Sequence, residues 1–158
     1  MKIKYLTFVS RIRNEEQEIE RLVERTKKAW EKANNSSDEL YIDSVALNLH
    51  GFYSSLEKIF ELIANQIDDS IPEGSSWHQE LLKQMTFDIK GLRPAVISEN
   101  TAELLDEYRG FRHVVRNVYT FKLSFKKIKP LINSLDRVYS EFKREIDLFI
   151  KYIEENNT

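Results

Sequence analysis

The feature that most constrains the fold is an apolar pattern with helical spacing between residues 42 and 67. Its main row advances by three and four positions without a break, and a second row lies beside it. Two adjacent rows give a helix a wide apolar face, which predicts a central position in a helical bundle. The two rows consist of Ile42, Val45, Leu49, Phe52, Leu56, Ile59 and Ile63, and of Tyr53, Phe60 and Ile67. Gly51 lies in the middle of this helix, where we expect another helix to pack closely.

The rest of the chain has helical periodicity as well, interrupted by only four glycines and three prolines in 158 residues. Further helices are expected over about residues 3–33 and 76–90, from about residue 100, and from about residue 127 or a little earlier. Asn100 with Glu103 resembles a capping box that would open the fourth helix. Pro130 is compatible with the last helix if it falls in the first turn. The sequence predicts an all-α fold, with residues 1–158 forming one domain as an antiparallel bundle of four to five helices.

Composition excludes several classes of function. The chain has no cysteine, which removes disulfides, thiolate metal sites and cysteine nucleophiles. Its three histidines show no HxxxH or HExxH spacing, so we expect neither a metal nor another cofactor. No segment approaches the roughly 18 apolar residues that span a bilayer, and arginines interrupt the first apolar run before it could form a signal-peptide core. A cytoplasmic protein without a membrane partner is expected.

Positive charge is concentrated between Arg109 and Lys129. This stretch contains seven of the 24 Lys and Arg residues and no Asp or Glu, although the whole chain has a formal net charge of −2. Such segregation predicts an anionic partner. On a helix, four side chains of the stretch fall within an arc of roughly 100°. They are Arg109, Arg112, His113 and Arg116, and they lie opposite an apolar stripe formed by Leu104, Tyr108, Phe111, Val115 and Val118.

Two interpretations of this basic helix face are open. Its arginines could pair with carboxylates of another helix on a solvated surface, or they could bind RNA. The absence of acidic residues favours RNA, because a planar guanidinium binds two phosphate oxygens at once and histidine transfers protons near neutral pH. Tyr119 and Phe121 could stack on bases. Lys122, Lys126 and Lys127 would then contact the RNA backbone as a rim.

Four segments of the chain read YIDSVALNLHGFYSSLEKIFELIA, WHQELLKQM, RPAVIS and ELLDEYRGFRHVVRNVYTFKL. They resemble the HepT-like branch of the HEPN superfamily, small all-α ribonuclease toxins paired with MNT-type minimal nucleotidyltransferase antitoxins. The resemblance extends from about residue 41 to the C-terminus, and the last segment is its most specific part. It implies a homodimeric helical bundle that cleaves RNA without a metal ion. The active site of such toxins is composite, formed by the arginine–histidine motifs of two protomers.

The family motif is an arginine, four to six residues, a histidine, one further residue and a tyrosine. Aligned on it, Arg112 and Tyr119 match the arginine and the tyrosine, whereas Asn117 stands at the histidine position. Either His113, on the same face of the helix, has taken over proton transfer, or this chain is a weak or inactive nuclease. Arg112, His113 and Asn117 are therefore the candidate catalytic residues.

If the chain is active, the resemblance implies attack by the RNA 2′-hydroxyl on the adjacent phosphate. His113 would act as general base or acid, and Arg112 with Arg109 or Arg116 would stabilise the charge on the phosphate. The antitoxin of this family can add AMP to the motif tyrosine, which matches Tyr119; the negative charge of the adenylate would oppose RNA binding.

Two other classes of function remain possible at this stage. One is a non-catalytic HEPN subunit that binds RNA or nucleotide and partners a minimal nucleotidyltransferase, which Asn117 favours. The other is a structural helical adaptor, which leaves the basic segment unexplained. Outside that segment, His50 and His78 are expected to have structural roles, and Tyr53 is expected to pack in the core.

Overall fold

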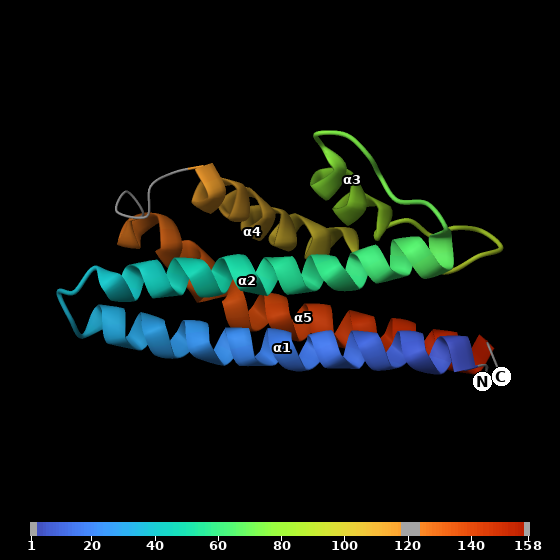
Figure 1. The fold of residues 1–158 in the computed structure, drawn as a ribbon, viewed down its shortest axis with the longest axis horizontal. Coiled ribbons are helices and arrows are strands. Elements are labelled where there is room, and N and C mark those ends of the chain that lie inside the picture. Colours follow the sequence, from blue (N-terminus) through green and yellow to red (C-terminus); the bar gives the residue numbers. More distant parts are fainter. Residues whose placement is uncertain (1–2, 118–123, 157–158) are drawn as a thin grey trace.

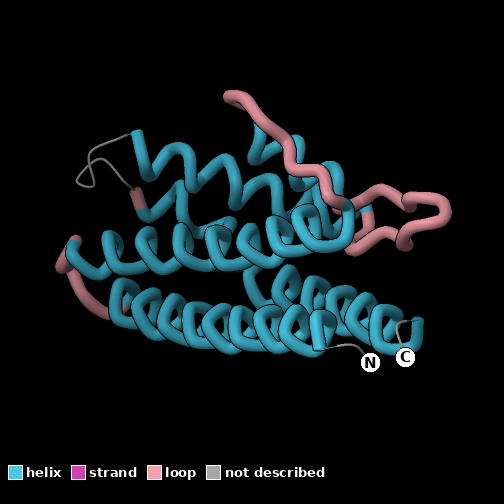
Figure 2. The backbone as a smooth tube through the Cα atoms, turned by 45° about the vertical axis from the view of Figure 1, so that its right-hand side comes forward, coloured by secondary structure: helices cyan, strands magenta, loops and turns pink. Residues whose placement is uncertain are grey.

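The computed structural model describes residues 3–117 and 124–156, and for residues 116 and 117 it describes the helical backbone alone. Within these residues the chain is a succession of helices joined by loops, with no strand (Figure 2). The helices are α1 (Ile3–Asn34), α2 (Leu40–Ile63), α3 (Trp77–Gln84), α4 (Glu99–Asn117) and α5 (Phe125–Asn156), and one π-helical turn, η1 (Ala64–Asp68), extends α2. The predicted all-α bundle is confirmed.

Neighbouring helices run antiparallel, as Figure 1 shows. α1 and α2 form a long hairpin, α5 lies against α1 and α4, and α3 and α4 cover the other side of α2. α2 contacts all four other helices, which confirms the central position predicted from its apolar rows. Both rows are buried, except for the half-buried Ile42 and Ile67. None of the helices, over the described part of the chain, is long and apolar enough to cross a membrane.

Gly51 allows α1 to approach α2 closely, as expected. A Cβ atom added at Gly51 would lie only 3.2 Å from Cδ2 of Leu22 on α1. α4 and α5 are joined differently, through a buried hydrogen bond. The hydroxyl of Tyr108 on α4 donates to the carbonyl of Leu131 on α5 at 2.7 Å, and it lies 2.7 Å from Oγ of Ser134. The close approach at Gly51 sets the spacing of α1 and α2, and the hydrogen bond of Tyr108 sets the spacing of α4 and α5.

α3 ends at Gln84, six residues earlier than predicted. Groups of Arg93 and Val96 donate to the backbone carbonyls to which the next turn of the helix would otherwise donate. The carbonyl of Met85 accepts from the backbone N–H of Val96 at 2.9 Å. The buried guanidinium of Arg93 donates to the carbonyls of Gln84 and Phe87 at 3.3 and 3.0 Å. Its Nη2 also lies 2.7 Å from Oδ2 of the Asp68 carboxylate at the end of η1. Arg93 thus ties the end of α3 to the end of α2.

The cap of α4 and the place of Pro130 in α5 also differ from expectation. The cap of α4 is Ser98, whose Oγ accepts from the backbone N–H of Thr101 at 3.1 Å, so the predicted capping box of Asn100 and Glu103 is wrong. α5 begins at Phe125, which places Pro130 beyond the first turn. Pro130 has no N–H to donate to the carbonyl of Lys126, four positions earlier, and Lys126 is an exposed residue at the helix start.

The apolar stripe of α4 largely follows the prediction. Tyr108 and Phe111 are buried and Val115 is half-buried against the core. Leu105, rather than the predicted Leu104, is fully buried. Val118 lies outside the described residues. The side of α4 that carries Arg109, Arg112 and His113 is thereby left to face away from the core.

Candidate functional site

A cavity of about 590 Å³ lies between α4 and the segment that leads into α3. Figure 1 shows how these elements meet: the loop after η1 turns back over the bundle and brings α3 beside α4. The wall from α4 consists of Arg109, Arg112 and His113, and the opposite wall consists of Gly74, Ser75, Ser76, Trp77, His78 and Gln79. A volume of this size is in the range of ligand-binding sites. Three of the candidate residues therefore line one cavity.

Arg112 is held between this cavity and α2. Its Nε donates a hydrogen bond to Oγ of Ser54 at 3.0 Å, and the side chain is half-buried. The bond fixes one edge of the planar guanidinium. The terminal amino groups extend beyond it, and these are the groups that can bind two phosphate oxygens together.

Arg109 is paired within its own helix. Its Nε lies 2.6 Å from Oδ1 of Asp106, one turn earlier, and 48% of the Asp106 side chain is exposed. The solvated-face interpretation placed the carboxylate partners on another helix, and the structure shows a different arrangement for Arg109. An exposed pair of this spacing contributes at most about 1 kcal/mol, so an incoming phosphate can compete with Asp106 for the guanidinium.

The remaining candidates from α4 and the following segment lie at or beyond the helix end. Arg116 and Asn117 belong to the last turn of α4, and their side chains are outside the described part. Tyr119 and Lys122 lie outside the described residues. His113, one turn before the end of α4, is exposed and lines the cavity.

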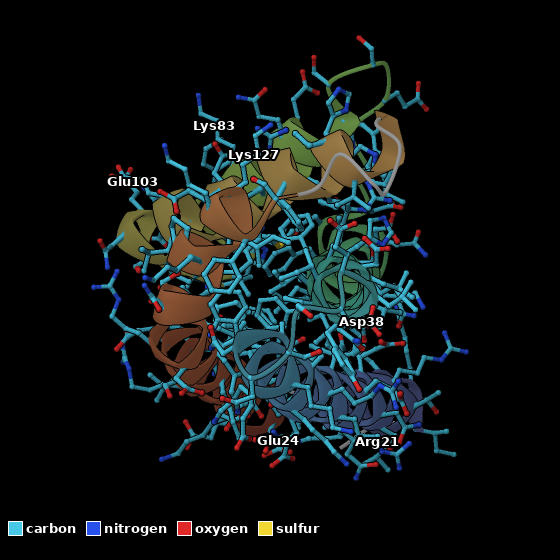
Figure 3. The ribbon with its side chains drawn as sticks, turned by 90° about the vertical axis from the view of Figure 1, so that its left-hand side faces the viewer. Arg21, Glu24, Asp38, Lys83, Glu103 and Lys127 are labelled. Atoms are coloured by element: carbon cyan, nitrogen blue, oxygen red, sulfur yellow. The ribbon has the colours of Figure 1, made fainter. Side chains whose placement is uncertain are left out.

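Lys126 and Lys127 are exposed at the start of α5. In the end view of Figure 3, Lys127 lies in the same half of the molecule as Lys83 of α3. Arg21 and Glu24 of α1 lie in the opposite half. Lys127 is thus on the side of the bundle that carries α3 and α4, though it is not part of the cavity wall.

His78 is a second histidine in the cavity wall, and a structural role was expected for it from the sequence. Its Nδ1 lies 2.8 Å from Oε2 of Glu57 on α2. The ring of Trp77 covers it, with 3.6 Å between the two ring centroids. Glu57 is buried, with 5% of its surface exposed. One sequence signal for this pair existed: Glu57 is an acid between the apolar residues of the central helix, and such a buried charge requires a partner.

Charges on α2 and α4 influence one another beneath the cavity. Tyr53 is fully buried, as expected, and its hydroxyl has no hydrogen-bond partner among the described residues. Burial and the charge of Glu57 raise the pKa of this hydroxyl, while Arg109 and Arg112 oppose the rise. Burial and the charge of Glu57 also raise the pKa of Glu61, and the charges of His78 and Arg112 partly offset this rise. The site therefore combines carboxylates from α2 with guanidiniums from α4.

This arrangement provides the groups needed for phosphate binding and proton transfer. Guanidiniums can hold the non-bridging oxygens of a phosphodiester. The two imidazoles of the cavity wall belong to the side-chain class most often used for proton transfer. Among the described residues, no group of three His, Asp or Glu side chains could hold a metal ion.

In a comparison with known families, the chain matches a family described as HepT-like protein over residues 44–153. The matched region begins near the start of α2 and continues into the last turn of α5, so it includes every residue of the cavity wall. No curated protein and no solved structure matches the chain.

Proposed function

Because this chain belongs to the HepT-like protein family, we propose that it is the toxin of a HEPN/MNT-type toxin–antitoxin pair and cleaves cellular RNA, tRNA or mRNA, without a metal ion. The observation that carries the proposal is the cavity lined by Arg109, Arg112 and His113. A cavity with two guanidiniums and imidazoles in its wall suits a phosphodiester. The acid-free sequence from Arg109 to Lys129 adds positive potential that attracts RNA.

Cleavage uses the 2′-hydroxyl of the RNA as nucleophile. The 2′-oxygen attacks the adjacent phosphorus, and the bond from phosphorus to the 5′-oxygen of the next nucleotide breaks. His113 transfers a proton in this step, as general base or acid. Arg112, with Arg109 or Arg116, binds the non-bridging oxygens, where negative charge increases in the transition state. Lys126 and Lys127 contact the RNA backbone outside the cavity.

The proposed partners are those that the resemblance to this family implies. Two copies of the chain form a homodimer in which the two basic cavities face a shared cleft. An MNT-type nucleotidyltransferase neutralises the toxin by adding AMP to Tyr119, two positions after the end of α4. The added phosphate carries negative charge, which would repel the RNA backbone from the basic site.

A second candidate function is a non-catalytic subunit that binds RNA or nucleotide and serves a nucleotidyltransferase. Asn117 is the observation that favours it, since this residue stands where the family motif has histidine. An asparagine cannot act as an acid–base group near neutral pH. Such a subunit would bind RNA with a strong dependence on salt and would release it uncut.

The test begins with expression of the chain alone and of two arginine variants. We expect the wild-type chain to arrest growth and the purified protein to cleave RNA in the presence of a metal chelator. Arg112→Ala should relieve the arrest, because it removes the guanidinium held over the cavity. Arg21→Ala is the matched control, since Arg21 is an exposed arginine in the opposite half of the molecule (Figure 3). Harmless wild-type protein that binds RNA without cutting it would favour the non-catalytic subunit.

A further inference from the structure

We infer that His78 is a second catalytic residue of this cavity and acts as the general base, while His113 acts as the general acid. The inference rests on the proposed ribonuclease function and names groups that neither the family motif nor the sequence pattern identifies. Glu57 is the positioning residue, because it acts on the RNA through His78. The evidence is the geometry of the Glu57–His78 pair and its place in the cavity wall.

The hydrogen bond to Glu57 determines which ring nitrogen of His78 is available. Glu57 carries an acceptor carboxylate, so Nδ1 of a neutral His78 must hold the proton that lies between the two groups, 2.8 Å apart. Nε2 then has a lone pair and can accept a proton. The carboxylate behind the ring holds the imidazole in this tautomer and orientation while Nε2 takes up a proton.

The surroundings hold the ring of His78 in place without closing it off from the cavity. Trp77 stacks on the ring on one side, and Glu57 is buried beneath it. The His78 side chain nevertheless keeps 22% of its surface exposed, and it lines the cavity that Arg112 and His113 also line. A histidine that merely satisfied a buried carboxylate would not need to share a wall with an arginine and another histidine.

The charged groups that face His78 come from two helices. Glu57 and Glu61 lie on α2, and Glu61 is close enough for the charge of His78 to affect its pKa. Arg109, Arg112 and His113 lie on α4 across the cavity. The site therefore has carboxylates on the side of the base and guanidiniums on the side where the phosphate would bind.

The proposed step balances without a further reactant. Nε2 of His78 removes the proton of the 2′-hydroxyl as the bond from O2′ to phosphorus forms. The protonated His113 gives its proton to the 5′-oxygen as the bond from phosphorus to O5′ breaks. The products are a 2′,3′-cyclic phosphate and a 5′-hydroxyl end. Proton exchange with water returns both histidines to their starting states.

The test compares His78→Gln, His113→Gln and Glu57→Gln in the purified full chain, with His50→Gln as the histidine control outside the cavity. Two substrates are used, ordinary RNA and RNA whose leaving 5′-oxygen is replaced by sulfur, which departs without protonation. On ordinary RNA we expect a loss of about 100-fold or more for either cavity histidine variant, and about 10- to 100-fold for Glu57→Gln. The sulfur substrate should restore His113→Gln and leave His78→Gln impaired. Binding of non-cleavable 2′-O-methyl RNA should change little.

The pH dependence gives a second readout that a structural role would not change. His78→Gln should remove the rise of the cleavage rate with pH that a general base produces, and wild-type protein should retain it. If a glutamine at this position lowers the melting temperature, His78→Gly with added imidazole replaces it, and rescue by imidazole is expected.

Three results would decide against the inference in distinguishable ways. Wild-type rates in a folded His78→Gln variant would refute the role of His78 and leave the proposed ribonuclease intact. Rescue of His78→Gln by the sulfur substrate, with no rescue of His113→Gln, would reverse the two roles and overturn the assignment. Absence of cleavage by the wild-type protein itself would refute the proposed function, and the inference with it.

Discussion

Nε of Arg112 donates a hydrogen bond to Oγ of Ser54, with 3.0 Å between the two atoms. The bond links Arg112, the candidate catalytic arginine on α4, to the central helix α2. Ser54 precedes Glu57 by three positions, so α2 supports both walls of the cavity: it contacts Arg112 through the hydroxyl and His78 through the carboxylate. The orientation of Arg112 therefore depends on a residue outside the motif.

Removing this hydroxyl should weaken the function of Arg112 without removing its charge. A neutral hydrogen bond contributes about 1 kcal/mol, so we expect Ser54→Ala to lower the rate of RNA cleavage, or the affinity for RNA, by roughly fivefold. Ser55→Ala is the control, because Ser55 is the adjacent buried serine on the same helix. Equal effects of the two substitutions on cleavage or RNA binding would show that the contact of Ser54 with Arg112 has no functional importance.

The buried ion pair of Arg93 and Asp68 should be essential for stability. The two side chains have exposed fractions of 0% and 2%, and Arg93 also donates to backbone carbonyls around the end of α3. Asp68→Ala leaves the guanidinium buried without its carboxylate, which should lower the free energy of unfolding by about 3 kcal/mol or more. Urea denaturation measures this loss.

The control for the ion pair is Arg144→Ala on α5. Arg144 pairs with Glu141 at 2.9 Å, but 59% of its side chain is exposed. We expect no measurable change in the urea midpoint for this variant. A midpoint for Asp68→Ala as high as that of Arg144→Ala would contradict a stabilising role of the buried pair.

Replacing Asp69 by glycine should stabilise the protein. Asp69 follows η1 with φ of 50°, in the left-handed region where a Cβ atom is unfavourable and glycine is the usual residue at a helix end. Asp69→Gly should raise the free energy of unfolding by about 0.5–1 kcal/mol. Asp88→Gly is the control, since Asp88 is an exposed loop residue that does not have positive φ. A lower melting temperature for Asp69→Gly than for wild type would contradict the prediction.

Stability should fall in acid through Asp147. Although burial opposes the change, hydrogen bonds from Lys143 and Arg13 hold the pKa of Asp147 below its usual value. A carboxyl whose pKa is lower in the folded state stabilises the fold at higher pH, and this stabilisation is lost as pH falls below about 3.9 through the folded-state pKa. Asp147→Asn should therefore reduce the free energy of unfolding near neutral pH and have less effect at pH 2.

The titration of the neighbouring Glu16 must be eliminated from this measurement. Burial raises the pKa of Glu16, so its contribution to the free energy of unfolding has the opposite pH dependence. Both Asp147→Asn and its reference should therefore carry Glu16→Gln. Asp136→Asn, in the same background, is a control at an exposed carboxylate that pairs with Lys27 at 3.2 Å. A constant effect of Asp147→Asn between pH 2 and 7 would contradict the lowered pKa.

Local sequence patterns predicted the elements whose structure depends on periodicity. The apolar rows of α2 were enough to give its central position, because a wide apolar face can be buried only among other helices. The same reasoning placed Arg109, Arg112 and His113 on the exposed side of α4. Residues separated by helical spacing have a fixed relation to one another, and a single sequence contains that information.

Contacts between distant segments could not be predicted in this way. His78 meets Glu57, 21 positions earlier, because the loop after η1 returns over the bundle, and no local pattern specifies that path. Arg93 ends α3 through carbonyls and a carboxylate up to 25 positions away, whereas periodicity alone extended the helix to about residue 90. Capping was missed for a smaller reason: Ser98 and Asn100 are both suitable caps, and in the structure it is Ser98 that accepts from the backbone N–H of Thr101.

The hydrogen bond from Tyr108 to the carbonyl of Leu131 has a consequence for the arginines of α4. Tyr108 precedes Arg109 directly, and any rotation of α4 about its axis would carry the hydroxyl away from a buried acceptor. This hydrogen bond therefore fixes the direction in which the side of α4 that carries Arg109 and Arg112 faces, and it does so without a ligand. A preorganised face spends less binding free energy on ordering its side chains when a ligand binds. The buried hydroxyl of Tyr108 thus keeps Arg109 and Arg112 turned toward the cavity.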